Sequence, residues 1–134
     1  RVAGVTEGDE VLVPALSFVA TANAVAYLGA TPHFVYSEER TLGLDPDKLG
    51  TYLDDIAEVR DGTCVNTQTD RPIRAVVPMH TYGHPVDLNP LQEVCEECAV
   101  DAATEKDGDA LFLWYSFFDC FVYEFSGLFS SFVW

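Results

Sequence analysis

Short runs of apolar residues alternate with longer stretches of helical periodicity along most of this chain. The apolar runs are rich in β-branched residues and end at turn formers, which is typical of buried strands. The predicted strands are residues 11–13, 33–36 and 73–78, with a short further strand at 99–101. The predicted helices are residues 18–28, 47–59 and 87–98. Strands separated by helices must lie parallel, so the pattern predicts an α/β fold, a three-layer sandwich with a mainly parallel sheet.

Two of these helices carry start signals. Ser17 is the expected N-cap of the first helix, because its hydroxyl can accept a hydrogen bond from the first turn. Asp45 and Pro46 are expected to begin the second helix as N-cap and first helical residue. Residues 60–72, in contrast, are polar, rich in turn formers and without periodicity, which predicts a loop.

The composition divides the chain into residues 1–106 and 107–134, which we interpret as a domain and an aromatic-rich tail. Residues 111–134 contain seven of the nine Phe and both Trp, with no Lys or Arg. A bilayer is spanned by about 20 apolar residues, but Asp119 and Glu124 make insertion costly, so membrane association is not expected. A lost reading frame, a truncation and a genuine segment stay open as explanations of the tail.

The charge balance argues against one class of partner. Seven basic residues against 22 acidic ones give a formal net charge of −15, which repels nucleic acid and anionic membrane surfaces. The basic residues do not cluster either. We therefore expect a small-molecule or protein partner and no nucleic acid.

The cysteines indicate a reducing environment. The chain has four cysteines and no N-terminal signal peptide, which is typical of reduced thiols in a cytoplasmic protein. Cys95 and Cys98 form a C-x-x-C that could bind zinc. Their spacing within a predicted helix favours a packing role instead, since it places two small residues on one face. No metal is expected.

Two stretches carry a resemblance to a known family. GDEVLVPALSFVATANAVAYLGATPHFV, residues 8–35, resembles the DegT/DnrJ/StrS family of sugar-nucleotide aminotransferases, which are fold-type-I enzymes that use pyridoxal phosphate (PLP). GTCVNTQTDRPIRAVVPMHTYGHPVDLNPLQEVC, residues 62–95, resembles the branch that acts on the way to legionaminic-acid-type sugars. The match covers about residues 1–105, so the chain is expected to be an internal fragment of the family's large domain.

The resemblance implies a reaction and an assembly. The family transfers an amino group from glutamate to the keto carbon of a 4-keto-6-deoxy sugar nucleotide. The enzymes are dimeric, with the active site built across the interface, so a homo-oligomer is expected.

The resemblance also assigns candidate site residues. Phe18 matches the aromatic position that stacks on the cofactor, and Asp101, in AVDAAT, matches the carboxylate that keeps the pyridine nitrogen protonated. Thr104 stands where the family has Glu, Gln or His at the cofactor, and His80 matches the H-x-x-G-x-P loop near cofactor or substrate. The plainer alternatives are core packing for Phe18, a cap or turn for Asp101, and a bond to loop backbone for His80, which is the role favoured for it. Because parallel strands end at one edge, Phe18, His80 and Asp101 should lie near one another there.

One group that the family needs is missing. The family holds its cofactor covalently through the lysine of an S-F-x-x-x-K pattern, and after Ser116 and Phe117 this position is Phe121. The two lysines of the chain are Lys48 and Lys106. No catalytic residue is therefore assigned, and the chain is expected to be inactive as it stands. The alternatives are a non-enzymatic α/β association domain and a domain with a membrane-seeking tail.

Overall fold

The computed structural model describes residues 4–81 and 85–102, which belong to one compact unit, Arg1–Ala103. Its sheet has six strands in the order β2-β1-β5-β4-β3, with β6 also beside β5. The strands are β1 (Glu10–Pro14), β2 (Thr31–Val35), β3 (Ala57–Arg60), β4 (Thr63–Asn66), β5 (Arg71–Val76) and β6 (Asp101–Ala102). The helices are α1 (Val19–Ala26), α2 (Pro46–Ile56) and α3 (Leu88–Glu97).

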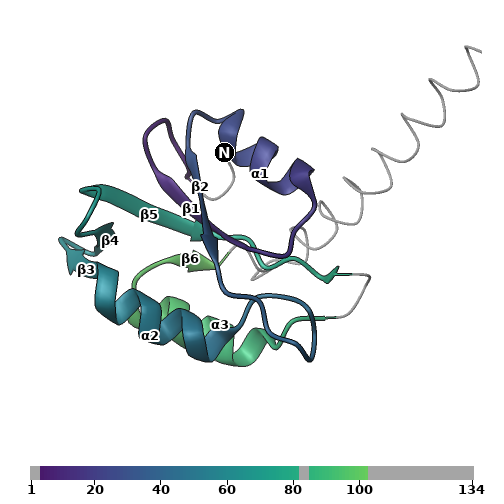
Figure 1. The fold of residues 1–134 in the computed structure, drawn as a ribbon. Helices are drawn as coiled ribbons and strands as arrows, with labels where there is room; N and C mark the ends of the chain where they lie inside the picture. Colours follow the sequence, from purple (N-terminus) through teal and green to yellow (C-terminus); the bar gives the residue numbers. More distant parts are fainter. Residues whose placement is uncertain (1–3, 82–84, 103–134) are drawn as a thin grey trace, which may run out of the picture. The chain divides into compact units, whose positions relative to one another are not determined.

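The predicted three-layer α/β fold is confirmed. Helix α1 covers one face of the sheet, and α2 and α3 lie together on the other face (Figure 1). Each face has its own apolar core: Val11, Val13 and Val25 pack in the layer of α1, while Leu12 and Leu91 belong to the larger cluster under α2 and α3. All five residues of β1 are buried, as expected of a central strand covered on both faces.

The predicted parallel strands are confirmed, with adjusted ends. Strand β1 pairs in parallel with β2 and β5, and β5 pairs in parallel with β6. The fourth strand begins later than predicted because Ala99 has a positive φ of 52° and ends α3 in a turn, with the Val100 N–H donating to the carbonyl of Cys95 over 3.0 Å. The strand therefore starts at Asp101.

The predicted loop at 60–72 is wrong. Strands β3 and β4 form an antiparallel hairpin there, in which Val59 faces Cys64. Strand β4 also pairs in antiparallel orientation with the start of β5. Asp61 and Gly62 form the turn with positive φ values of 51° and 76°, the conformation that two-residue hairpin turns require. The predicted helix 47–59 accordingly stops at Ile56, since the following residues belong to β3.

The helix starts give one confirmation and one correction. The Asp45 side chain accepts a hydrogen bond from the Lys48 N–H at 3.1 Å, and Pro46 follows, as predicted for α2. Ser17 is not the N-cap of α1: that position is Phe18, which makes no side-chain capping bond. The hydroxyl of Ser17 instead donates to the sulfur of Met79 at 3.1 Å, a partner distant in sequence.

In the part of the chain that the structure describes, no helix is long and apolar enough to cross a membrane. The aromatic residues of 111–134 lie outside the described residues. The division of the chain at position 106 and the nature of its tail therefore stay predictions.

Candidate functional site

The loop that follows β1 carries Phe18 to the carboxyl edge of the sheet. The Ala15 N–H donates to the Val35 carbonyl at 2.8 Å and the Leu16 N–H donates to Ser37 Oγ at 3.1 Å, so the end of β2 holds the loop on one side. On the other side, the Phe18 N–H donates to Met79 Sδ at 3.3 Å. The Phe18 side chain is 48% exposed and thus offers apolar surface at this edge.

His80 lies in the segment after β5, at the same edge. Its Nδ1 accepts a hydrogen bond from the Val86 N–H at 3.2 Å, which places the proton of the neutral ring on Nε2. Burial lowers the pKa of His80, because a charged imidazole would lose hydration there. This contact is the bond to loop backbone that the sequence favoured for His80. A role toward cofactor or substrate stays a prediction.

Asp101 opens β6, whose backbone lies in register with the carboxyl end of β5 through the pair Asp101 and Ala75. Strand β5 lies between β1 and β6, so Asp101 is two strand positions from β1. Neighbouring strands lie about 5 Å apart, so the strand before Phe18 and the strand of Asp101 are within two strand spacings. The clustering of Phe18, His80 and Asp101 themselves stays a prediction. Thr104 lies outside the described residues, and so does Lys106.

Lys48 does not supply the missing amine. It lies in the first turn of α2, where its Nζ is 3.0 Å from Asp45 Oδ2 and 6.0 Å from the centre of the Tyr36 ring. The hydrogen bond and the negative charge of Asp45 raise the pKa of Lys48, which keeps it protonated. A protonated amine is not a nucleophile.

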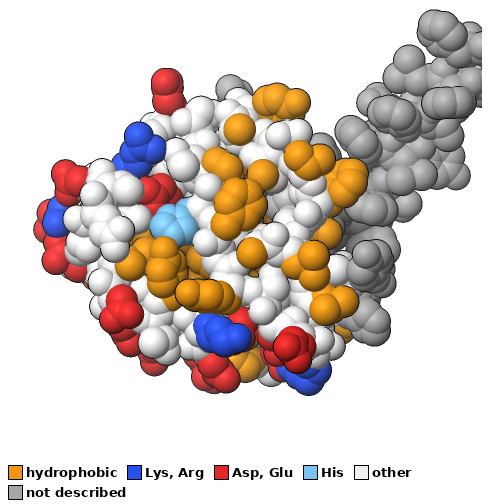
Figure 2. All heavy atoms as spheres, in the orientation of Figure 1, with side chains coloured by type: hydrophobic (Ala, Val, Ile, Leu, Met, Phe, Trp, Pro, Cys, Tyr) orange, Lys and Arg blue, Asp and Glu red, His pale blue; other side chains and the backbone are white. Residues whose placement is uncertain are grey.

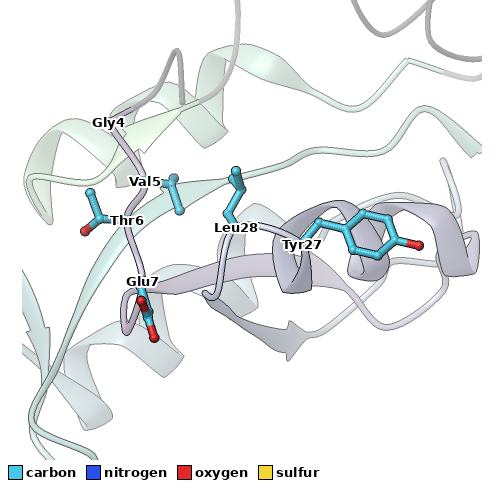
Figure 3. A pocket seen from close by; sticks show the side chains of 6 residues that line it. All are labelled: Gly4, Val5, Thr6, Glu7, Tyr27 and Leu28. Atoms are coloured by element: carbon cyan, nitrogen blue, oxygen red, sulfur yellow. The ribbon is translucent and has the colours of Figure 1, made fainter.

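A cavity of about 390 Å³ lies at the opposite, amino edge of the sheet, between the turn before β1 and the end of α1 (Figure 3). Its lining residues are Gly4, Val5, Thr6, Glu7, Tyr27 and Leu28. Glu7 is the one charged side chain among them, so the lining offers no cation for a phosphate. This cavity is therefore not the expected cofactor site.

Sequence reasoning missed a buried polar network at the start of β1. Glu10 is 2% exposed and accepts hydrogen bonds from His33 Nδ1 at 2.9 Å, Asn66 Nδ2 at 2.9 Å and Thr69 Oγ1 at 2.6 Å. On the far side of His33, Nε2 lies 2.9 Å from the hydroxyl of Tyr52 in α2. The sequence did contain a signal for this network. Glu10 is a carboxylate at the start of an otherwise apolar strand, and a buried charge requires polar partners.

The C-x-x-C cysteines are divided between core and surface. Cys95 is 3% exposed and belongs to the core under α2 and α3, while Cys98 is the C-cap of α3 and only partly buried. Within residues 4–81 and 85–102, no group of three or more His, Cys, Asp or Glu is arranged to hold a metal ion.

Comparison with known proteins shows the family of this chain. The sequence profile of the DegT/DnrJ/EryC1/StrS aminotransferase family matches residues 1–103. The chain belongs to this family. Among its curated relatives, GDP-perosamine synthase of Caulobacter vibrioides is 38% identical over 91 residues, covering 68% of this chain and 20% of the relative. UDP-N-acetyl-3-dehydro-alpha-D-glucosamine 3-aminotransferase of Acidithiobacillus ferrooxidans is 32% identical over 112 residues, covering 78% of this chain and 26% of the relative.

Solved protein structures share this fold. NtdA of Bacillus subtilis, crystallised with its bound cofactor PMP, is 27% identical with a TM-score of 0.58, covering 75% of this chain and 19% of NtdA. The chain thus spans about a fifth to a quarter of the length of the relatives it matches. The family membership is confirmed, whereas the relatives do not single out the legionaminic-acid branch.

Proposed function

We propose that this chain is part of a PLP-dependent aminotransferase that aminates a nucleotide sugar. The observation that carries the proposal is the match of residues 1–103 to the aminotransferase family. It is joined by the loop of Phe18 after β1 and by Asp101 beside the carboxyl end of β5, the strand next to β1. Carboxyl edges of parallel sheets are where α/β proteins bind small ligands.

The described residues fit part of a PLP site. The half-exposed ring of Phe18 is a suitable surface for stacking a pyridine ring, and Asp101 is the candidate carboxylate for its nitrogen. PLP, when bound, supplies an electron sink for the amino transfer. Thr104 and His80 complete the set of candidate contacts, with His80 holding the loop through Val86.

The substrate we propose is a 4-keto-6-deoxy sugar nucleotide, with glutamate as amino donor, in a legionaminic-acid-type pathway. The likeness of residues 62–95 to that branch supports it. The names of the relatives include a GDP-sugar synthase and a UDP-sugar 3-aminotransferase. The nucleotide and the position of the keto group therefore need a direct test.

A segment exchange tests both levels of this proposal. Residues 4–102 would replace the matching segment of the 3-aminotransferase from Acidithiobacillus ferrooxidans, and the chimera would be assayed with glutamate on UDP- and GDP-linked 3-keto and 4-keto sugars. Amino-sugar formation that falls at least about tenfold in Asp101→Asn supports the family function. A shift of preference toward the 4-keto sugars supports the proposed substrate. A folded, PLP-binding chimera without activity on any of these sugars contradicts the proposal.

For the 134-residue chain by itself, we propose cofactor docking without catalysis. Pyridoxamine phosphate (PMP) should bind weakly, and Phe18→Ala should weaken it roughly two- to tenfold, as expected for loss of an aromatic stack. Tyr27→Ala is a control, because Tyr27 is also an exposed aromatic residue, at 86%, but lies at the end of α1 beside the cavity of the amino edge. After incubation with PLP and borohydride, mass spectrometry should find no site-specific covalent adduct. An adduct that disappears in Lys106→Ala would contradict this proposal and support the hypothesis of an active enzyme.

An association role is the second candidate. Apolar side chains gather over α1 and β2 in Figure 2. The exposed large apolar residues in or next to these two elements include Leu16, Val19, Phe34 and Tyr36, each at least 48% exposed. Exposed patches of this kind mark interfaces, and β2 is also an open sheet edge. We propose homo-oligomers, in a cytoplasmic protein. Light scattering should give a mass above the monomer that falls toward it in Phe34→Glu, and an unchanged monomer mass for the parent chain contradicts this role.

A further inference from the structure

The sulfur of Met79 contacts the start of α1 in an unusual way. It accepts two hydrogen bonds, from the Phe18 N–H at 3.3 Å and from Ser17 Oγ at 3.1 Å. A thioether is a weak acceptor, and the N-cap position of α1 makes no side-chain capping bond of its own. The sulfur therefore does not cap the first turn of α1, but it binds the backbone of the N-cap residue at the point where the chain enters the helix.

Met79 is itself held firmly by the neighbouring loop. It is 8% exposed, and its carbonyl oxygen would lie 3.1 Å from a Cβ added to Gly43. Two residues further along, Thr81 Oγ1 donates to the Leu42 carbonyl at 3.0 Å. Residues 79–81 are thus held against the loop before α2, which makes Met79 a stable support for the Phe18 segment.

We propose that Met79 is a positioning residue, whose sulfur fixes the backbone at Phe18 and thereby the orientation in which the Phe18 ring meets a bound cofactor. This rests on the proposed role of Phe18 as the surface for the cofactor ring. Stacking depends on ring orientation, so a displaced Phe18 loses contact area even though its side chain is unchanged. A leucine at position 79 would fill similar space but offer no acceptor.

Two substitutions separate the acceptor from the packing. Met79→Leu keeps an apolar side chain of similar size and removes the acceptor, whereas Met79→Gln offers an amide oxygen, one bond beyond the position of the sulfur, as a replacement acceptor for the same donors. Ile56→Leu is a matched control, because Ile56 is also buried, with 4% exposure, but lies in α2. Ser17→Ala removes one of the two donors and leaves Met79 in place.

The readouts are amide exchange at Phe18 and PMP affinity, both by NMR on the 134-residue chain. Met79→Leu should speed exchange of the Phe18 amide roughly three- to tenfold and weaken PMP by a similar factor, as expected for one lost hydrogen bond. Met79→Gln should restore both. Met79 is also the single methionine of the chain, so a labelled methyl group gives one signal that PMP should shift.

The outcomes are distinct. Unchanged exchange in Met79→Leu, or faster exchange with unchanged PMP affinity, overturns the positioning role. If the wild-type chain does not bind PMP at millimolar concentration, the proposed docking at Phe18 is wrong, and exchange alone then decides whether the sulfur orders this backbone. If Met79→Leu does not fold, Ser17→Ala takes its place in the test. It should speed Phe18 amide exchange and weaken PMP binding by smaller factors, and unchanged values of both overturn the proposal.

Discussion

Replacing Glu10 should destabilise the fold more than any other single change of a charged residue in the described chain. The carboxylate is buried at the head of β1 and links three elements, because its partners lie on β2, on β4 and in the turn before β5. Burial by itself would raise the pKa of Glu10, but the hydrogen bonds from Thr69, Asn66 and His33 outweigh it and hold the pKa below its ordinary value.

The magnitude follows from those three bonds. Glu10→Ala leaves the buried amide of Asn66 and the partly exposed donors of His33 and Thr69 without their acceptor. It also opens a small cavity in the buried start of β1, and together these losses cost about 3–5 kcal/mol in the free energy of unfolding. Glu10→Gln keeps the shape and part of the acceptor capacity, and should cost only about 1–2 kcal/mol. Since domains of this size have a total stability of about 5–15 kcal/mol, the alanine variant should be close to unfolding.

Urea unfolding followed by circular dichroism measures both costs. Glu96→Gln is the matched control, because Glu96 is exposed on α3 and should shift stability by less than about 0.5 kcal/mol. A cycle that combines Glu10→Gln with His33→Ala should show coupling, since the two side chains are in direct contact at 2.9 Å. If the free energy of unfolding of Glu10→Ala lies within about 0.5 kcal/mol of that of the control, the network does not contribute to stability as argued.

The pH dependence has a definite sign. A carboxylate whose pKa is lowered in the folded state stabilises the fold above its unfolded pKa, for which 4.5 is the ordinary value. That stabilisation disappears as the pH falls below 4.5 through the folded pKa. The difference in unfolding free energy between wild type and Glu10→Gln should therefore be constant at neutral pH and shrink under acid conditions.

Further tests concern packing and titration elsewhere. Gly43→Ala should cost about 1–3 kcal/mol in urea unfolding, because the added methyl group overlaps the neighbouring side chain, whereas Gly50→Ala inside α2 should stabilise by about 0.5–1 kcal/mol. Because burial lowers the pKa of His80, wild-type stability should decline as the pH falls from about 6.5, and His80→Gln should flatten that decline. Burial raises the pKa of Cys64 to about 11, so its alkylation at pH 8, followed by mass spectrometry, should be much slower than in urea.

The main elements could be predicted from sequence because their signals are local. The apolar runs of β1 and β5 and the capping pair Asp45 and Pro46 each lie within a few residues of the structure they specify. The hairpin was missed although Asp61 and Gly62 are a hairpin turn signal. Strand β3 has no buried residue, so it lacks the apolar alternation that would have revealed it beside the turn.

The candidate site, too, could be predicted from the sequence only in part. Phe18, His80 and Asp101 could be proposed because a family resemblance marks positions, and the parallel topology then predicts their common edge. The partners of these residues could not be predicted. The bond from the Phe18 N–H to Met79 joins residues 61 positions apart, and the one from Asn66 to Glu10 joins residues 56 apart. A single sequence contains no local pattern for such pairs.

The two ends of β1 are stabilised by chemically different means. At the amino end, a buried carboxylate with three hydrogen bonds joins β1 to β2 and β4, and its loss should reduce the stability of the whole fold. At the carboxyl end, a weak thioether acceptor fixes only the segment that carries Phe18. A five-residue strand places these contacts about 15 Å apart, and they share no partner, so their energetic effects should add independently. Strong polar bonding thus lies away from the candidate site, so loss of the Met79 contact should disturb the Phe18 segment while leaving the stability of the fold largely unchanged.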